Sequence, residues 1–384
     1  MVSITLRGIT WDHRRAIDPL LGTLPDFRAG HPDIDVDWSS RPLHGFEFTP
    51  VDELAKLFDL IVLDHPFAGH IAATGCLEPL DPLFTDELRS SFVGPSLESY
   101  VYGGRTWAMP VDAACQVAAE RPDLVGVLGH DVPRTWESMF ALGEDARRRG
   151  QWLAIGLKGV HGLMTLFTLC ANLGRPCGVT TDRSLLDTEA ARAALDALRR
   201  LLSYCPPDVL DWNSIALHDQ MVGRDDLVYC PAVYCYATYA EMDMRRPLRF
   251  HDLPGLTSAT PSGSTVGGTG VGLSASSRHS EAARTYIRYL AESETQMAFA
   301  ENHGQPARRE VWQDPVIDAR FGATYRSTLR TIDLAWIRPR YPGFLSLQLR
   351  GGELVERHLR GQISEDALLQ ELERLHRSAR RIFG

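Results

Sequence analysis

Acidic residues and histidines stand side by side at two points of the sequence, and each point directly follows a strand-like segment. The residues concerned are Asp12, His13, Asp64, His65 and His70. A carboxylate beside an imidazole can bind hydroxyl groups, and it can also orient the ring for proton transfer. Two functions therefore stay open: recognition of a hydroxyl-rich solute, or catalysis with His13 or His65 as general base and Asp12 or Asp64 beside it. A histidine that only holds the structure together is the alternative at each position.

Predicted strands lie directly before these residues. Residues 2–10 alternate polar and apolar side chains, which is typical of a half-buried strand, and 59–64 form the apolar run of a buried one. Helical patterns over 13–29 and after Thr49 flank a further strand over 34–38. The order β-α-β-α-β predicts a mainly parallel sheet, and its carboxyl edge would collect both acid–histidine segments.

Trp11 and Arg14 complete the group expected after the first strand. The Trp11 ring could stack on the apolar face of a sugar, while Arg14 would donate hydrogen bonds. The alternative is an ordinary helix start, with Asp12 as the cap and its neighbours in solvent. Zinc is disfavoured because His65 and His70 lack the spacing of one helical turn and have no accompanying glutamate. We expect no metal and no cofactor.

Composition and charge exclude several classes of protein. The 384 residues include 40 basic and 49 acidic ones, which gives a formal net charge of -9. A negative charge disfavours binding to the negatively charged backbone of nucleic acid. No apolar stretch approaches the roughly 18 residues that cross a bilayer, so no transmembrane segment is expected. The 7 cysteines are odd in number and favour reduced buried thiols, although a disulfide between Cys170 and Cys177 stays open. Nucleotide-binding, hydrolase and metalloprotease motifs are missing from the sequence.

The residues after Met1 predict a strand and not a secretory leader. A leader would need a basic start, an apolar stretch and a cleavage site before the fold begins. Either the protein is cytoplasmic, or it is periplasmic or extracellular and its leader has been removed.

Four short motifs follow one another along the chain. They are Gly103-Gly-Arg-Thr-Trp-Ala-Met-Pro110, Pro133-Arg-Thr-Trp-Glu137, the glycine-rich strand Gly267–Ser274, and Gly304-Gln-Pro-Ala-Arg308. Each is similar to a motif of the sugar-type extracellular solute-binding proteins of ABC transporters, the maltose-binding-protein-like family 1. The order and spacing of the motifs make the resemblance specific, and it extends over nearly the whole chain.

The resemblance implies a two-lobed, periplasmic-binding-protein-like α/β fold. Each lobe would be a mainly parallel sheet flanked by helices, with hinge strands between the lobes and a ligand in the cleft. Lobe one would take residues 1–110 and 243–303, and lobe two would take 111–242 and 304–384. The expected partners are a small-molecule ligand and, if the protein is exported, an ABC permease.

Further ligand contacts are expected from both lobes. They are Asp112, Gln116, Tyr234, Tyr236, Gly267, Gly268, Thr269 and Tyr341. Tyr234 and Tyr236 would share one face of a strand, so both would reach the cleft or both would lie in the core. The glycines would let backbone amides approach a ligand. The sequence thus favours a binding protein that closes around a sugar, polyol or related metabolite, and an intracellular enzyme on the same scaffold is the alternative.

Overall fold

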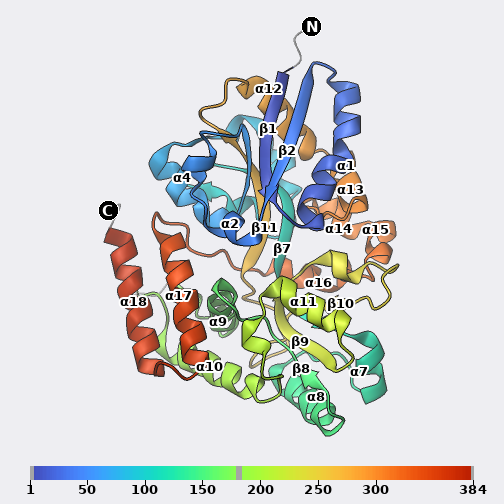
Figure 1. Cartoon of the computed structure of the whole chain (residues 1–384), viewed down its shortest axis with the longest axis vertical. Helices are drawn as coiled ribbons and strands as arrows, with labels where there is room; N and C mark the ends of the chain where they lie inside the picture. Colours follow the sequence, from blue (N-terminus) through green and yellow to red (C-terminus); the bar gives the residue numbers. More distant parts are fainter. Residues whose placement is uncertain (1–3, 179–183, 382–384) are drawn as a thin grey trace. The chain divides into compact units, whose positions relative to one another are not determined.

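The computed structural model describes residues 4–178 and 184–381, which form two compact units. Unit 1 contains the chain up to Ala114, Gly267–Asp318 and Arg340–Pro342. Unit 2 contains Cys115–Val266, Ala319–Pro339 and the chain from Gly343 onward. The chain therefore passes between the units several times, as the colours of Figure 1 allow the reader to follow. Residues 2 and 3 of the predicted first strand lie outside the described residues.

Parallel strands form the first part of the unit 1 sheet. β1 (Ile4–Trp11) lies between β2 (Ile34–Arg41) and β3 (Leu60–Leu63) and pairs in parallel with both. β11 (Val266–Ser274) pairs antiparallel with β3 and with the short β4 (Leu77–Glu78). β3 is apolar and buried along its whole length, as a strand covered on both faces should be.

Amphipathic helices cover this sheet. α1 (Arg14–Gly30) packs on β1 and β2, α13 (Ser293–Glu301) packs on α1, and α12 (Ser280–Leu290) packs on β1 (Figure 1). α1 buries Leu24 and Phe27, which lie one helical turn apart on its inner face. The shorter elements are α2 (Leu43–Phe48), α3 (Val51–Leu54), α4 (Ala68–Thr74), α5 (Asp86–Ser90), α6 (Ser96–Ser99), β5 (Val101–Tyr102), β6 (Arg105–Thr106), α14 (Arg309–Gln313) and α15 (Pro315–Arg320), with 3-10 turns at His65–Phe67 and Asp81–Leu83.

The long strand β7 (Met109–Glu120) begins in unit 1 and ends in unit 2. In unit 2 it pairs antiparallel with β9 (Leu227–Tyr234) and with β10 (Arg249–His251), while β9 pairs in parallel with β8 (Trp152–Leu153). Every residue of β7 is buried. The strand is therefore part of the core along its whole length.

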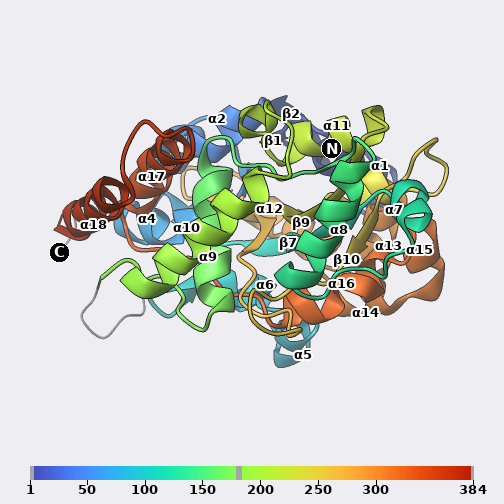
Figure 2. The same ribbon diagram turned by 90° about the horizontal axis from the view of Figure 1, so that it is seen from below.

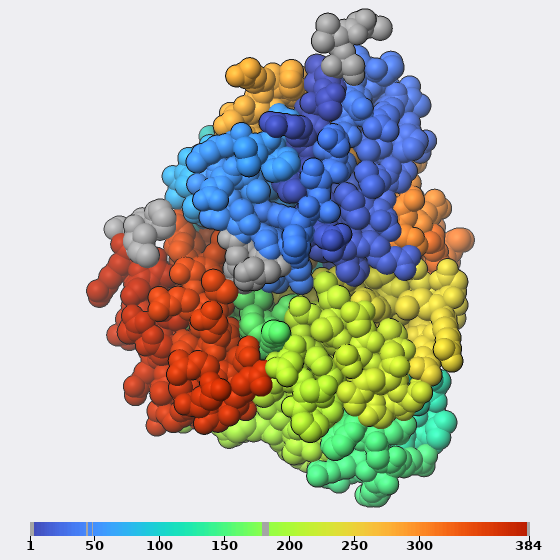
Figure 3. Space-filling view, viewed as in Figure 1, coloured from blue at the N-terminus to red at the C-terminus, as the bar shows by residue number. Residues whose placement is uncertain are grey.

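The central helix of unit 2 is α9 (Val160–Asn172), which is buried from Val160 to Ala171. It packs against α10 (Thr188–Leu202) and α17 (Phe344–Leu359), and α18 (Glu365–Arg381) packs on α17. Figure 2 shows α17 and α18 side by side, and Figure 3 shows them in red on one face of the molecule. The remaining helices are α7 (Pro122–Leu128), α8 (Trp136–Arg148), α11 (Ser214–Gly223) and α16 (Thr324–Asp333), with 3-10 turns at Val209–Asp211 and Ala237–Ala240.

Both sheets are mixed, because each contains parallel and antiparallel strand pairs. β11 runs antiparallel to β3 in unit 1, and β7 runs antiparallel to β9 in unit 2. β11 re-enters unit 1 only after the chain has passed through unit 2, so no crossover helix from β3 forces it to be parallel. No helix within the described residues is long and apolar enough to span a membrane.

The bounds of the units differ from the expected lobes in four segments, which are 111–114, 243–266, 304–318 and 340–342. Residues 243–266 belong to unit 2, because β10 pairs with the last residues of β7. Residues 304–318 belong to unit 1. There the Ala113 N–H donates to the Gln305 carbonyl at 3.0 Å, and Gln305 Nε2 donates to the Ala113 carbonyl at 2.8 Å.

Candidate functional site

The carboxyl ends of β1, β2 and β3 lie at one edge of the unit 1 sheet, which we call the carboxyl edge. The register pairs Trp11 with Arg41 and Ile9 with Ile61, so β1 and β3 end level with each other. Two segments far apart in the sequence, one after Trp11 and one after Leu63, therefore begin at the same edge. This edge is where the acid–histidine segments stand.

The start of α1 holds the segment Asp12–Arg14. Asp12 and Arg14 are exposed, and Arg14 Nη2 lies 2.9 Å from the ring nitrogens of His303. His13, and not Asp12, caps the helix, because its Nδ1 accepts the Arg15 N–H at 3.1 Å. Burial, with the charges of Arg15 and Arg14, lowers the pKa of His13 to about 4. The ring is neutral at pH 7, and Nε2 carries the proton because Nδ1 accepts.

Asp64 and His65 make a local contact at a 3-10 turn. Asp64 Oδ1 accepts the His65 N–H at 2.8 Å and lies 2.9 Å from His65 Nδ1. His65 is fully buried, with its ring edge-on to Tyr100. His70 lies on α4, and its Nε2 is 2.8 Å from Asp52 Oδ1. Asp64 and His70 are partly exposed, so these two residues, and not His65, can meet a solute.

Asp112 is bound by a neighbouring arginine inside unit 1. Arg15 Nε donates to Oδ2 at 2.8 Å and Nη2 donates to Oδ1 at 2.6 Å, and neither side chain is more than 4% exposed. The pKa of Asp112 is raised, because burial outweighs the opposite effects of Arg15 and of the hydrogen bond from the Thr269 backbone N–H. A cavity of about 10 Å³, whose lining includes Thr10 and Trp11, adjoins the pair and has room for one water. Asp112 meets a solute only if its pair with Arg15 opens.

The glycines of β11 serve close backbone packing. Gly268 has a φ of 95°, and a Cβ at this position would collide with the carbonyl oxygen of Asp112. Only glycine combines this conformation with such an approach. Gly267 is partly exposed and Thr269 is buried. Tyr341 belongs to the short unit 1 segment Arg340–Pro342 and is partly exposed.

In unit 2, Gln116 belongs to a buried network of hydroxyl groups. Its Nε2 donates to Thr165 Oγ1 at 3.1 Å, and its Oε1 accepts from Thr168 Oγ1 at 2.6 Å. Thr168 Oγ1 lies 3.0 Å from Thr265 Oγ1, which lies 3.0 Å from the Tyr234 hydroxyl. Gln116 is 1% exposed, so its amide serves the packing of unit 2.

Tyr234 and Tyr236 do not share one environment. β9 ends at Tyr234, so the alternation that would place both rings on one face stops before Tyr236. Tyr234 is partly exposed, with its ring edge-on to His161. Tyr236 is buried beside His218. Of the two rings, only Tyr234 is accessible enough to be a ligand contact.

Sequence reasoning misses two residues of the carboxyl edge, Arg41 and Phe46. The predicted second strand stops at Trp38, whereas β2 continues to Arg41. The centre of the Phe46 ring on α2 lies 5.0 Å from the centre of the Trp11 ring. Trp11 is only 4% exposed, so a sugar cannot stack on its ring. The length of β1 is the signal for Arg41, because a parallel partner of similar length must reach the same edge.

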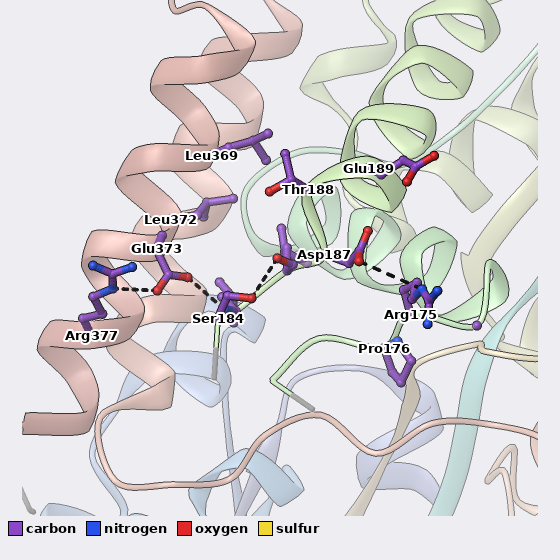
Figure 4. Close-up of a pocket in the computed structure, with 13 residues that line it drawn as sticks. Arg175, Pro176, Ser184, Asp187, Thr188, Glu189, Leu369, Leu372, Glu373 and Arg377 are labelled. Carbon is purple, nitrogen blue, oxygen red and sulfur yellow. Dashed lines mark hydrogen bonds and ion pairs between the residues drawn. The ribbon is translucent and has the colours of Figure 1, made fainter. Parts of the chain in front are cut away.

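A larger pocket of about 650 Å³ lies in unit 2 between α18 and the chain that leads into α10 (Figure 4). In this pocket Glu373 accepts the Leu185 N–H at 2.8 Å and Arg377 Nε at 2.8 Å. None of the sequence-predicted site residues is among the described residues that line it. Ser184, which lines the pocket, is the first described residue after a gap in the described chain, so we assign the pocket no function.

Comparison with known proteins decides the family. A family model described as bacterial extracellular solute-binding protein matches residues 53–320. This chain belongs to that family. The match confirms the resemblance that the sequence motifs indicate.

Solved structures of solute-binding proteins share the fold at low identity. Maltose-bound MalE3 of T. maritima is 19% identical with a TM-score of 0.85, and the match covers 98% of this chain and 99% of that one. A ribitol complex of an ABC transporter solute-binding protein from Agrobacterium radiobacter K84 is 20% identical, with a TM-score of 0.79 and 100% coverage of both chains. A protein from Agrobacterium vitis S4 with bound D-mannitol is 16% identical, with a TM-score of 0.81, covering 100% of this chain and 99% of that one. The predicted two-lobed α/β fold of the periplasmic-binding type is thus confirmed.

Proposed function

We propose that this chain is the binding protein of an ABC transporter and that its solute is a sugar, a polyol or a related small polar molecule. Membership of a bacterial extracellular solute-binding family supports solute binding. The similar structures contain maltose, ribitol and D-mannitol, which supports a hydroxyl-rich solute. On this proposal the protein acts in the periplasm or outside the cell and delivers its solute to a membrane permease.

The register of β1 and β3 is the observation that carries the proposal for the site. It supports a solute position at the carboxyl edge, where exposed and partly exposed groups of both polarities lie together. Asp12 and Asp64 offer acceptor oxygens, while Arg14 and the Nε2–H of His13 offer donors. Sugar and polyol hydroxyl groups both donate and accept, so they match such a mixed set.

The enzyme alternative has weaker support. The Asp64–His65 contact belongs to a tight turn, and a fully buried His65 is poorly placed to take a proton from a solute. His13 uses Nδ1 to cap α1, which gives the ring a structural role without any reaction. The contacts described for both histidines fit a structural role.

Calorimetric titration with neutral sugars, polyols, sugar acids and sugar phosphates tests the proposal. We expect at least one of these solutes to bind, and we expect Asp12→Ala to weaken that binding by roughly tenfold or more, since hydrogen bonds to charged groups contribute about 1.5–3 kcal/mol. Asp33→Ala is the matched control, because Asp33 is also exposed but precedes β2 at the opposite edge of the same sheet. Absence of binding by every solute, or equal weakening in both variants, would contradict the proposal.

A further inference from the structure

Arg41, the last residue of β2, carries a charge that no described side chain neutralises. Its Nε and Nη1 atoms are buried and make no hydrogen bond to any residue that the structure describes. Burial alone lowers the pKa of Arg41 to about 10, so the guanidinium is still charged at pH 7. Burying a donor without a partner is unfavourable, and burying an unpaired charge is more so. Arg41 as a whole is only partly buried, and its Nε and Nη1 donors have no hydrogen-bond partner among the described residues.

Aromatic side chains hold Arg41 beside a second unused donor. Arg41 Cζ lies 5.8 Å from the centre of the Phe46 ring, and the same ring packs 5.0 Å from Trp11. Trp11 is also the register partner of Arg41 across β1 and β2. The Trp11 Nε1–H is buried and has no hydrogen-bond partner among the described residues. The last residues of the adjacent strands β1 and β2 thus each carry a buried hydrogen-bond donor without a described partner.

Three carboxylates of unit 1 already contact a basic side chain other than Arg41. The pairs are Asp112–Arg15, Asp64–His65 and Asp52–His70. Asp12 follows Trp11 directly, but its side chain is exposed and contributes nothing to the pKa of Arg41. Among the described residues, no acidic side chain acts on the pKa of Arg41.

We propose that Arg41 and the indole N–H of Trp11 bind an oxyanion of the solute, so that the solute is a sugar acid or a sugar phosphate and not a neutral sugar. This inference rests on the proposed solute-binding function and specifies its substrate class. A guanidinium presents a planar fork of donors that matches two oxygens of a carboxylate or a phosphate. The two solutes share this chemistry, and separate titrations distinguish them.

The test compares matched solutes by calorimetry: D-glucose, D-glucuronate and D-glucose 6-phosphate, with other sugars and polyols as parallel series. For the wild-type chain we expect an acid or phosphate form to bind at least about tenfold more tightly than its neutral parent. Arg41→Gln should weaken that form by roughly tenfold to a hundredfold and leave the neutral parent unaffected. Arg288→Gln is the matched control, because Arg288 lies exposed on α12 of the same unit.

The other outcomes of these titrations distinguish the oxyanion site from the solute-binding function. A neutral solute that binds best, with an affinity that Arg41→Gln leaves unchanged, overturns the oxyanion site while solute binding stands. No binding by any solute of either kind overturns the proposed function and this inference with it. If Arg41→Gln does not fold, Arg41→Lys decides, because lysine keeps the charge but loses the fork. Unchanged anion affinity in that variant would overturn the role of Arg41.

Discussion

At the scale of single residues, the buried pair of Arg15 and Asp112 should contribute strongly to stability. Removing one partner of a buried, doubly hydrogen-bonded ion pair leaves the other charge uncompensated. We expect Asp112→Ala to lower the free energy of unfolding by about 3–5 kcal/mol, measured by urea denaturation. Asp33→Ala, at an exposed aspartate of the same unit, should change it by less than about 0.5 kcal/mol. Equal effects of the two substitutions would show that the pair is not formed.

His161 makes unit 2 sensitive to acid. Burial, with a smaller effect of Arg338, lowers its pKa from 6.5 to about 4, and its Nδ1 lies 3.0 Å from Ser214 Oγ. A histidine that is harder to protonate when folded favours the unfolded state as pH falls from about 6.5 towards 4. This group should cost about 2–3 kcal/mol of stability between pH 7 and pH 4.5.

Urea unfolding of His161→Gln at both pH values measures that cost. The loss between pH 7 and pH 4.5 should be smaller in this variant than in the wild type by the stated amount. His279→Gln, at an exposed histidine, should keep the wild-type loss. An unchanged pH dependence in His161→Gln would exclude its titration as the cause.

The residues at the carboxyl edge could be predicted more readily than their hydrogen-bond and ion-pair partners. Trp11, Asp12, His13 and Asp64 stand at the end of recognisable strands, so their common edge follows from the parallel order alone. The use of Asp112 by Arg15 depends on contacts between segments 97 residues apart, which no local pattern encodes. Sequence shows that a carboxylate is present but not whether it is already paired.

At the scale of elements, Gly268 tests how closely β11 approaches β7. Alanine at this position would be strained at a φ of 95° and would collide with the Asp112 carbonyl. We expect Gly268→Ala to lower the free energy of unfolding by at least about 2 kcal/mol. Gly30→Ala is the control, since an added Cβ at the end of α1 meets nothing within 4 Å. A neutral Gly268→Ala would contradict the close packing of these strands.

Elements with a regular period could be predicted closely, and those without one could not. The helix predicted over 13–29 is α1, and the strand over 59–64 contains β3. α9 has no polar face, because it is buried almost completely, so the amphipathic pattern that marks a helix is missing. β2 extends to Arg41 through polar residues that a hydrophobic pattern does not register, and the most distinctive cation of the carboxyl edge is missed with it.

At the scale of the whole molecule, solute binding should stabilise the fold. A ligand that binds only the folded chain adds about 2.7 kcal/mol at a hundredfold excess over its Kd. The solute found by calorimetry should therefore raise the midpoint of thermal unfolding, and the rise should be smaller in Asp12→Ala at the same concentration. An equal rise in both proteins would place the solute away from the carboxyl edge.

A crystal structure of the chain with that solute tests the central claim most directly. The account predicts solute density at the carboxyl ends of β1, β2 and β3, in contact with Asp12 or Asp64 and with an anionic group against Arg41. Density only at another place, such as the unit 2 pocket beside Glu373 and Arg377, would contradict it.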